Sequence, residues 1–311
     1  MSLIEQAAKR LEQLRQAGVE LPEEATAQPE QRARATSRSS DPYTAPIVPP
    51  PSAPEEKKNA SATSKRIELD LEAIGASGLL VPQATRSQLA DEYRVIKRPL
   101  IANAMGKGSE PIANGNLIMV TSALPGEGKS FTAINLAISI AMELDNTVML
   151  VDADVARPSV LNMLGLPPAP GLLDVVDKNS VDISGVLLRT NIEKLSILPS
   201  GTQHPRATEL LASDAMVRLL DDMASRYNDR IIIFDSPPLL LTTESRALAT
   251  HMGQIVIVVN AENTTQAAVK QAVDAIEACP VKMMVLNQAR QASTDGYGYG
   301  YGYGYGYGQE K

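Results

Sequence analysis

The segment "NLIMVTSALPGEGKS" (residues 116–130) decides the fold. Its first half is an apolar run of strand length, and its second half places two glycines, a lysine and a serine directly before a stretch with helical periodicity (129–144). A strand, a glycine-rich turn and a helix in this order are the context of a phosphate-binding loop. The sequence therefore predicts an α/β fold with an anion site at the carboxyl end of this strand.

Each residue of the loop has an expected role. Gly126 and Gly128 let consecutive main-chain N–H groups face a phosphate, Lys129 reaches the β- and γ-phosphates, and Ser130 offers a hydroxyl to Mg²⁺. Ala123 stands at the first position, where the loop pattern has glycine, but that residue only enters the turn. A glycine-rich turn without a ligand is the alternative. The residues expected at the nucleotide are Gly126, Glu127, Gly128, Lys129, Ser130 and Phe131.

Two further strand-like runs end in carboxylates. "VMLVDADVARP" (148–158) presents Asp152 and Asp154, and "IIIFDSPP" (231–238) presents Asp235. Ligands of open α/β sheets bind at the carboxyl ends of the strands, so Asp235 is expected to hold Mg²⁺ directly or through water. Asp152 could instead cap the following helix. The three segments together predict a Mg·ATP site and leave the phosphate acceptor open between water, a small molecule and a protein side chain.

The pattern over residues 66–290 predicts one globular domain. Continuous Ile/Val/Leu strands separated by helices indicate a parallel sheet covered by helices on both faces. The expected strands are residues 116–122, 146–154, 194–201, 229–238, 254–260 and 282–288, and the expected helices are residues 129–144, 216–227 and 264–279.

The composition limits the remaining possibilities. Hydrophobic residues make up 44% of the 311 residues with two Phe and no Trp, so the core must be aliphatic. A net charge of −7 argues against a nucleic-acid partner. A single cysteine, Cys279, excludes a disulfide framework and suggests a reducing compartment. The charged N-terminus does not resemble a signal peptide, and no apolar run approaches the roughly 20 residues that span a bilayer. We expect a cytoplasmic protein without a direct membrane span.

Three segments fall outside the predicted domain. Residues 1–22 have the apolar face of a short amphipathic helix, which is either a marginal terminus or a docking segment. Residues 23–65 are rich in Pro, Ser and Ala, as in a disordered linker. Residues 291–311 carry the repeat "GYGYGYGYGYGYG" (296–308), which holds six of the nine tyrosines of the chain.

The combination of "ALPGEGKS", "LVDADVARP" and "IIIFDSPP" resembles the bacterial protein-tyrosine kinases (BY-kinases) that accompany exopolysaccharide export. The N-terminal "SLIEQAAKRLEQLRQAG" followed by a Pro-rich linker looks like their exosortase-associated autokinase subgroup. The resemblance implies a P-loop NTPase fold of the deviant Walker type and ATP with Mg²⁺ as cofactors. It also implies that Asp152 acts as the general base for a tyrosine hydroxyl, with Lys129 and Asp154 assisting and Asp235 and Ser130 holding Mg²⁺. The family's second motif reads DxDxR, whereas this chain has Ala156 in place of the arginine and an arginine one residue later.

The same resemblance assigns roles outside the three motifs. A charged helix of the form ExxRxxR lies at the subunit interface of family rings, and "DEYRVIK" offers Asp91, Arg94 and Lys97, with an ordinary solvated helix face as the alternative. An Asn at a strand end, here Asn287, contacts adenine in related ATPases. The C-terminal tyrosine cluster is phosphorylated in trans by a neighbouring subunit, and its members here are Tyr297, Tyr299, Tyr301, Tyr303, Tyr305 and Tyr307.

The resemblance further implies a membrane-embedded chain-length or co-polymerase protein as the partner that recruits the kinase to the inner face of the cytoplasmic membrane and regulates exopolysaccharide synthesis and export. Two other functions remain open from the residues alone. One is a ParA/MinD-like positioning ATPase, although Leu124 stands where those proteins carry a signature lysine. The other is a non-catalytic nucleotide-binding scaffold. A sticky low-complexity tail is the alternative reading of the Gly-Tyr repeat.

Overall fold

The computed structural model covers one domain of the chain. The N-terminal helix predicted for residues 1–22 and the tail at 291–311 lie outside the described residues, as does the predicted linker apart from its last two residues. The first strand, β1, begins at Lys65, close to the predicted domain boundary. The structure describes residues 64–84, 86–108, 110–177, 181–227 and 229–290.

In this part of the chain, eight strands form one sheet in the order β1-β4-β5-β3-β6-β2-β7-β8. Neighbouring strands run parallel except β4 and β5, which pair antiparallel. The predicted parallel α/β architecture is therefore confirmed, with one reversed pair near an edge. The strands are β1 (Lys65–Arg66), β2 (Leu117–Ser122), β3 (Thr147–Asp152), β4 (Leu188–Arg189), β5 (Leu195–Leu198), β6 (Arg230–Asp235), β7 (Gln254–Asn260) and β8 (Val281–Asn287).

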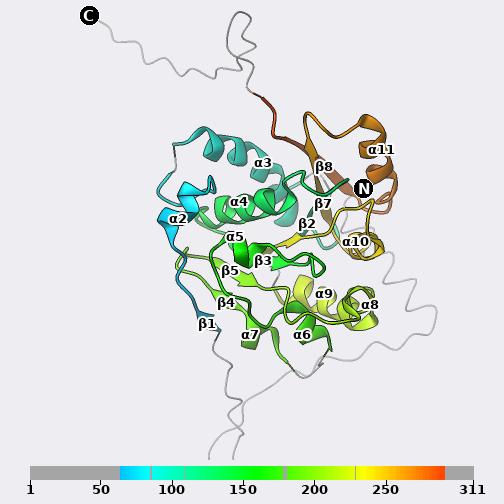
Figure 1. Cartoon of the computed structure of the whole chain (residues 1–311), viewed down its shortest axis with the longest axis horizontal. Helices are drawn as coiled ribbons and strands as arrows, with labels where there is room; N and C mark the ends of the chain where they lie inside the picture. The colour runs from blue at the N-terminus through cyan, green and yellow to red at the C-terminus, as the bar shows by residue number, and fades with distance from the viewer. Residues whose placement is uncertain (1–63, 85, 109, 178–180, 228, 291–311) are drawn as a thin grey trace, which may run out of the picture. The chain divides into compact units, whose positions relative to one another are not determined.

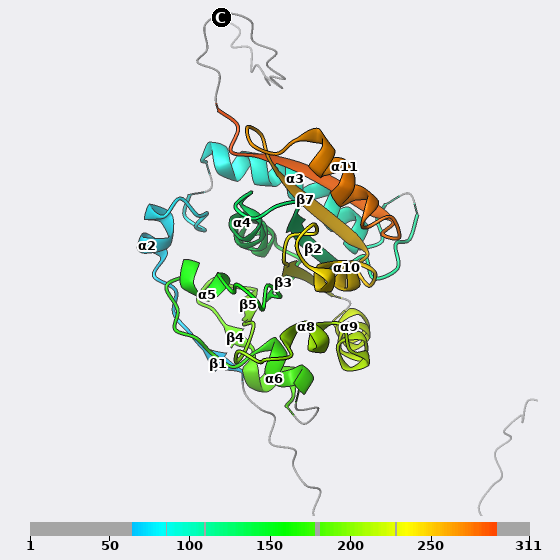
Figure 2. The same ribbon diagram turned by 45° about the vertical axis from the view of Figure 1, so that its right-hand side comes forward.

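Helices cover both faces of the sheet, as the apolar strands require. One core cluster packs α2, α3, α4 and α5 against one face, and a second packs α6 to α11 against the other. Figure 1 shows the layers, and the turned view of Figure 2 separates α4 from α10 with the central strands between them. The helices are α2 (Leu71–Ala76), α3 (Gln88–Ala104), α4 (Lys129–Ala141), α5 (Val160–Met163), α6 (Leu172–Asp177), α7 (Ile183–Val186), α8 (Ala207–Leu211), α9 (Asp214–Arg226), α10 (Thr243–Ala249) and α11 (Gln266–Asp274).

Helix α4 is the centre of the domain. Eleven of its residues are buried because it lies between α3 and the strands, and this explains why its apolar residues are not confined to one face. The helix ends at Ala141, whereas the sequence predicted helix to residue 144. The final turn does not form because Met142 caps the helix and Leu144 turns outward, with 86% of its surface exposed.

The order of the central strands positions the candidate site. Strands β3, β6 and β2 are neighbours, so the two carboxylate-bearing ends and the glycine-rich loop meet at the same edge of the sheet. Asp152 and Asp235 are direct register partners across β3 and β6. The opposite, amino-terminal edge of these strands is a separate surface.

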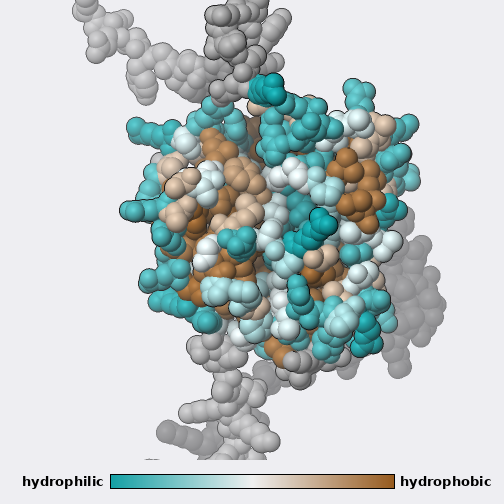
Figure 3. All heavy atoms as spheres, in the orientation of Figure 1, coloured by the Kyte–Doolittle hydropathy of each residue, from teal (hydrophilic) through white to brown (hydrophobic). Residues whose placement is uncertain are grey.

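The surface of the domain has no single apolar face in the view of Figure 3, where hydrophobic residues gather in separate patches among hydrophilic ones. Two of the exposed large hydrophobic residues, Met284 and Leu286, lie on the edge strand β8. No helix in the described ranges combines the length and apolarity that crossing a membrane requires.

Candidate nucleotide and phosphoryl-transfer site

The glycine-rich loop forms the expected cradle between β2 and α4. Gly126 and Gly128 both have positive φ angles, 82° and 93°, which residues with side chains rarely adopt. Gly128 is the N-cap of α4, and no side chain caps the helix. The first N–H groups of this long helix therefore remain available to an anion, and the helix dipole favours negative charge there.

Glu127 fixes the loop from inside the protein. Its Oε2 accepts a hydrogen bond from the Leu124 N–H at 2.6 Å, and its Oε1 accepts from the Asn260 N–H at 3.4 Å and from the Thr264 hydroxyl. The side chain is 3% exposed. Glu127 was predicted to contact the nucleotide, but its carboxylate is occupied by these three donors. Any contact with a phosphate must come from its main-chain N–H.

Lys129 brings the loop and the strand ends together. Its Nζ lies 2.7 Å from Asp154 Oδ2 and 3.6 Å from Asp235 Oδ1. Burial alone would lower the pKa of Lys129, but the nearby carboxylates of Asp235, Asp154 and Asp152 outweigh this effect and raise it. The cation is therefore fixed at the point where the phosphates of a nucleotide would add further negative charge.

The buried carboxylates are shifted toward neutrality. Burial, reinforced by the charge of Asp235, raises the pKa of Asp152 to about 7. Burial also raises the pKa of Asp235 to about 6, although Lys129 opposes the shift. A carboxyl group that titrates near neutral pH can accept and release a proton under physiological conditions. The raised pKa of Asp152 is compatible with the general-base role that the resemblance implies, and that role stays a prediction.

Asp152 also contacts the start of the following helix, which was the alternative role predicted for it. Its Oδ2 accepts a hydrogen bond from the Val160 N–H at 3.1 Å, at the start of α5, so the carboxylate does cap a short helix. Its Oδ1 is buried and has no hydrogen-bond partner in the described part of the chain. Capping therefore orients the carboxylate and leaves one oxygen for a ligand.

The polar side chains around Asp235 fit a Mg²⁺ ion. Both carboxylate oxygens of Asp235 are buried and have no well-formed hydrogen bond within the described part of the chain, and Ser130, at the start of α4, is a side-chain neighbour of this carboxylate. Among the described residues no three His, Cys, Asp or Glu side chains form a ready metal cage. Mg²⁺ needs none, because it is usually held by one or two protein oxygens together with water and phosphate oxygens. Ser130 and Asp235 fit that requirement.

Sequence reasoning missed Ser159. Its hydroxyl donates a hydrogen bond to the Ser130 hydroxyl at 2.8 Å and thereby links the loop to the segment after Asp154. The residue follows the proline of "ARPSV", and no motif marks it. Arg157, the candidate replacement for the family's arginine, is exposed, and its main-chain N–H donates to Asp154 Oδ1 at 3.1 Å. A role for its guanidinium stays a prediction.

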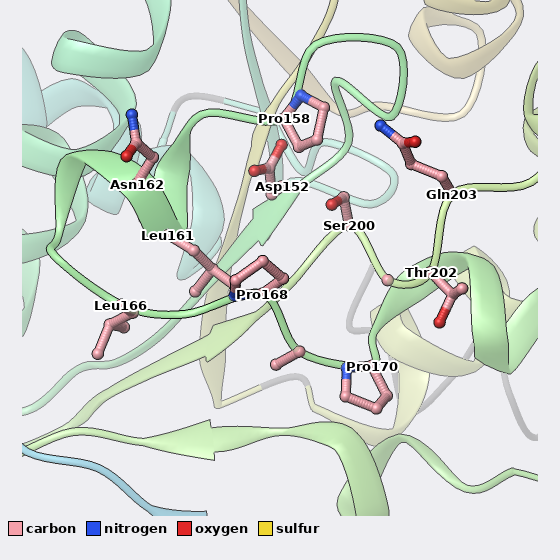
Figure 4. A pocket seen from close by; sticks show the side chains of 12 residues that line it. Asp152, Pro158, Leu161, Asn162, Leu166, Pro168, Pro170, Ser200, Thr202 and Gln203 are labelled. Carbon is pink, nitrogen blue, oxygen red and sulfur yellow. The ribbon is translucent and has the colours of Figure 1, made fainter.

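A cavity of about 590 Å³ opens beside Asp152. Figure 4 shows Asp152 and Pro158 at one end and Leu166 and Pro170 at the other, with the cavity between α5 and the segment that follows β5. The walls are largely apolar and rich in proline. Such walls offer packing surface for an apolar or aromatic group beside the carboxylate of Asp152. The run "LPPAPG" (166–171) was a visible signal for this cavity that sequence reasoning did not use.

Phe131 and Asn287 lie at a different groove. Both line a cavity of about 580 Å³ between α3 and β8. Asn287 Nδ2 donates to the main-chain oxygen of Glu127 at 2.9 Å, so this amide contacts the loop directly. The assignment of both residues to the nucleotide stays a prediction, now with a location at the side of the phosphate loop.

The predicted interface residues of α3 divide into two groups. Asp91 and Arg94 form an ion pair on the exposed side of the helix. Lys97 points inward: it is 4% exposed, and its Nζ donates to the Ser139 carbonyl at 2.5 Å and lies 2.6 Å from Glu143 Oε1. In this conformation Lys97 joins α3 to α4 within one chain and is not presented to a neighbour. The six tail tyrosines, Tyr297 to Tyr307, lie outside the described residues.

Comparison with known proteins identifies the class. The family model described as an AAA domain matches residues 115–288. Tyrosine-protein kinase YwqD of Bacillus subtilis (strain 168) is 33% identical over 199 residues, which cover 64% of this chain and 80% of the relative. The succinoglycan biosynthesis transport protein ExoP of Rhizobium meliloti (strain 1021) is 32% identical over 183 residues, which are 58% of this chain but only 22% of that protein.

Solved structures with a similar fold include tyrosine kinase domains. The chimerical protein CapA2B2 is 28% identical with a TM-score of 0.55, covering 71% of this chain and 93% of that chain. The kinase domain of the Escherichia coli tyrosine kinase ETK, at 24% identity, has the same fold with a TM-score of 0.57 over 68% of this chain and 80% of its own.

These matches and the loop-and-carboxylate geometry define a nucleotide-binding protein of the P-loop class. Within that class, the chain belongs to the bacterial protein-tyrosine kinases.

Proposed function

We propose that the protein transfers the γ-phosphoryl group of ATP to tyrosines in the Gly-Tyr tail of a neighbouring copy. The observation that carries this proposal is the position of Asp152. The residue lines a largely apolar cavity, and its Oδ1 has no hydrogen-bond partner among the described residues. Its register partner Asp235 lies beside Lys129. If water were the phosphate acceptor, the apolar walls of the cavity would have no role, whereas a phenol ring would pack against them. The repeat at the chain's own C-terminus supplies phenols without neighbouring bulk.

The reaction follows from the charges of the site. A phenol ionises near pH 10, so Asp152 assists by taking its proton as the phenol oxygen bonds to the γ-phosphorus. The bond between that phosphorus and the bridging oxygen breaks, and ADP leaves with the electron pair. Lys129 and the N-terminus of α4 stabilise charge on the transferring group. Bound Mg²⁺, held by Ser130 and Asp235, would neutralise phosphate charge.

The resemblance to kinases of polysaccharide export supports a place in that process. We propose that copies of the chain assemble into a ring through α3, and that a membrane-embedded chain-length or co-polymerase protein recruits the ring to the inner face of the cytoplasmic membrane. Phosphorylation of the tail in trans would then regulate exopolysaccharide synthesis and chain length. Each phosphate adds about −1.5 to −2 charge, so a modified tail is repelled by the carboxylates of the site.

The test is incubation of the purified chain with ATP and Mg²⁺, read by phosphotyrosine blotting and by ADP release. Wild type and Lys107→Met, which changes an exposed lysine, should acquire phosphotyrosine, and Lys129→Met should not. ADP release without phosphotyrosine would favour a positioning ATPase, and nucleotide binding without turnover would favour a scaffold. Either result contradicts the proposal.

A further inference from the structure

The amino-terminal edge of the sheet carries a polar cavity, at the end of the strands opposite to the phosphate loop. Its volume is about 670 Å³, and it is bounded by β1, β4 and the first residues of β3, β5 and β6. Four cationic residues line it against a single carboxylate, that of Glu193. The whole chain has a net charge of −7, so this local excess of positive charge runs against the general composition. The cationic residues are Arg66, Arg189, Lys194 and Arg230.

Strand register places two of these cations side by side. Arg66 of β1 and Arg189 of β4 are direct partners in the parallel pairing of the two strands. Like charges at directly opposed positions are destabilising unless a counter-ion lies between them. Neither arginine forms an ion pair with a carboxylate of the described residues. Both arginines are exposed, so they are accessible from solvent, and an anion bound between them would relieve their repulsion.

A second register pair contains donors without hydrogen-bond acceptors in the described part of the chain. Arg230 of β6 and Thr147 of β3 are opposed at the first positions of their strands. The Nε and Nη1 atoms of Arg230 and the hydroxyl of Thr147 are buried and find no hydrogen-bond partner in the described part of the chain. The guanidinium rests 4.8 Å from the centre of the Tyr227 ring, a contact that positions the charge without neutralising it. Buried donors without acceptors cost stability, and an anion would remove that cost.

The apolar residues of the cavity indicate which class of anion would fit it. Leu187, Ile192 and Leu195 line the same cavity and offer apolar surface beside the guanidinium groups. A phosphate monoester matches arginine forks, and an aromatic ring attached to it matches the apolar wall. An aryl phosphate joins both properties in one side chain. Free phosphate or a sugar phosphate would use only the charged half.

We propose that this cavity is a binding site for phosphotyrosine, and that its occupant is a phosphorylated tyrosine of the Gly-Tyr tail. The existence of an aryl-phosphate site follows from the cavity alone, while the tail as its source rests on the proposed kinase function. Binding there would hold the product tail at the edge of the sheet opposite the transferring site. The product would thus be kept away from Asp152 while unmodified tyrosines enter.

The experiment uses the full-length chain carrying Lys129→Met, so that its own tail is not phosphorylated. A fluorescent peptide with the sequence Gly-phosphotyrosine-Gly-Tyr-Gly is titrated and its anisotropy is measured. Competitors are the unphosphorylated peptide, phenyl phosphate and inorganic phosphate. Arg230→Gln and the double variant Arg66→Gln with Arg189→Gln are compared with Arg98→Gln, an exposed control on α3. Arg230→Lys retains the charge but loses the fork, so it serves as the conservative variant in case Arg230→Gln does not fold.

The phosphopeptide should bind and phenyl phosphate should displace it better than inorganic phosphate. Arg230→Gln and the double variant should each weaken binding about tenfold or more, because charge-assisted hydrogen bonds are lost, and Arg98→Gln should not. Binding that survives all arginine substitutions overturns the site. Equal competition by inorganic phosphate overturns the aryl class. If phenyl phosphate binds but the tail proves never to be phosphorylated, the site stands and the assigned source is overturned.

Discussion

Replacing Asp152 by asparagine is expected to stabilise the nucleotide-free protein at alkaline pH while it removes phosphoryl transfer. Burial raises the pKa of this carboxyl group from 3.8 to about 7 in the folded chain. In the unfolded chain the group ionises near its ordinary value. A carboxyl whose folded pKa is raised therefore lowers stability as the pH rises from about 4 to about 7, which is opposite to the effect of a salt-bridged carboxylate.

The size of the effect follows from the same values. The difference between 3.8 and about 7 corresponds to about 4 kcal/mol, at about 1.36 kcal/mol for each pKa unit. Asparagine keeps the volume and can still accept from the Val160 N–H, but the neutral hydrogen bond is weaker by about 1 kcal/mol. We expect a net gain of about 2–3 kcal/mol at pH 8 and almost none at pH 4.

Urea denaturation at pH 4, 6 and 8, without nucleotide or Mg²⁺, measures this gain. The midpoint of Asp152→Asn should exceed that of wild type at pH 8 with an unchanged m-value. The control, Asp145→Asn, changes an exposed carboxylate in the loop before β3 and should leave the midpoint unchanged at all three pH values. Kinase activity of Asp152→Asn should fall by about 10²–10⁴. Equal or lower stability at pH 8, or a gain that does not depend on pH, would refute the reasoning about burial.

Three other outcomes are expected. Glu127→Ala removes the side-chain acceptor of the Leu124 and Asn260 N–H groups, so thermal melting should show a loss of about 1–3 kcal/mol and ATP should bind more weakly. Glu127→Gln should lose less stability. Unchanged ATP affinity in the alanine variant would contradict the role of Glu127 in fixing the loop. Lys97→Met should lower the free energy of unfolding by only about 1 kcal/mol, because the side chain of Glu143 is 44% exposed and can be rehydrated. The oligomeric state measured by size-exclusion chromatography should not change. Dissociation of an oligomer would show that the lysine does reach a neighbouring copy. The rate of tyrosine phosphorylation should rise with pH through about 7 as Asp152 ionises, and a rate that falls over this range would exclude it as the base.

The phosphate loop and the carboxylates at the strand ends were predictable because each is a local pattern. A glycine-rich turn between a strand and a helix needs no knowledge of the rest of the chain, and Asp152 and Asp235 could be placed at one edge from the parallel topology alone. Their register pairing and their raised pKa values could not, since both depend on which strands are neighbours and on how deeply they are buried.

The sequence was least informative where long side chains have a choice of direction. Lys97 has the spacing of an exposed charged face, but α3 crosses α4 so closely that the side chain reaches the Ser139 carbonyl. Glu127 sits inside the loop motif and yet points into the protein. The adjacent arginines of β1 and β4 come from two-residue strands that no periodicity marks. In each case tertiary packing, and not local pattern, decides what the side chain contacts.

The measurement that tests the central claim most directly is a mixing experiment between two variants. The donor has all six tail tyrosines replaced by phenylalanine and keeps its catalytic residues, and the acceptor carries Lys129→Met with an intact tail. The two are incubated with labelled ATP and Mg²⁺, separated by an affinity tag, and mapped by mass spectrometry. The account predicts label on the acceptor, confined to Tyr297 through Tyr307. Label that remains on the donor, or an acceptor that stays unlabelled although the donor hydrolyses ATP, would contradict it.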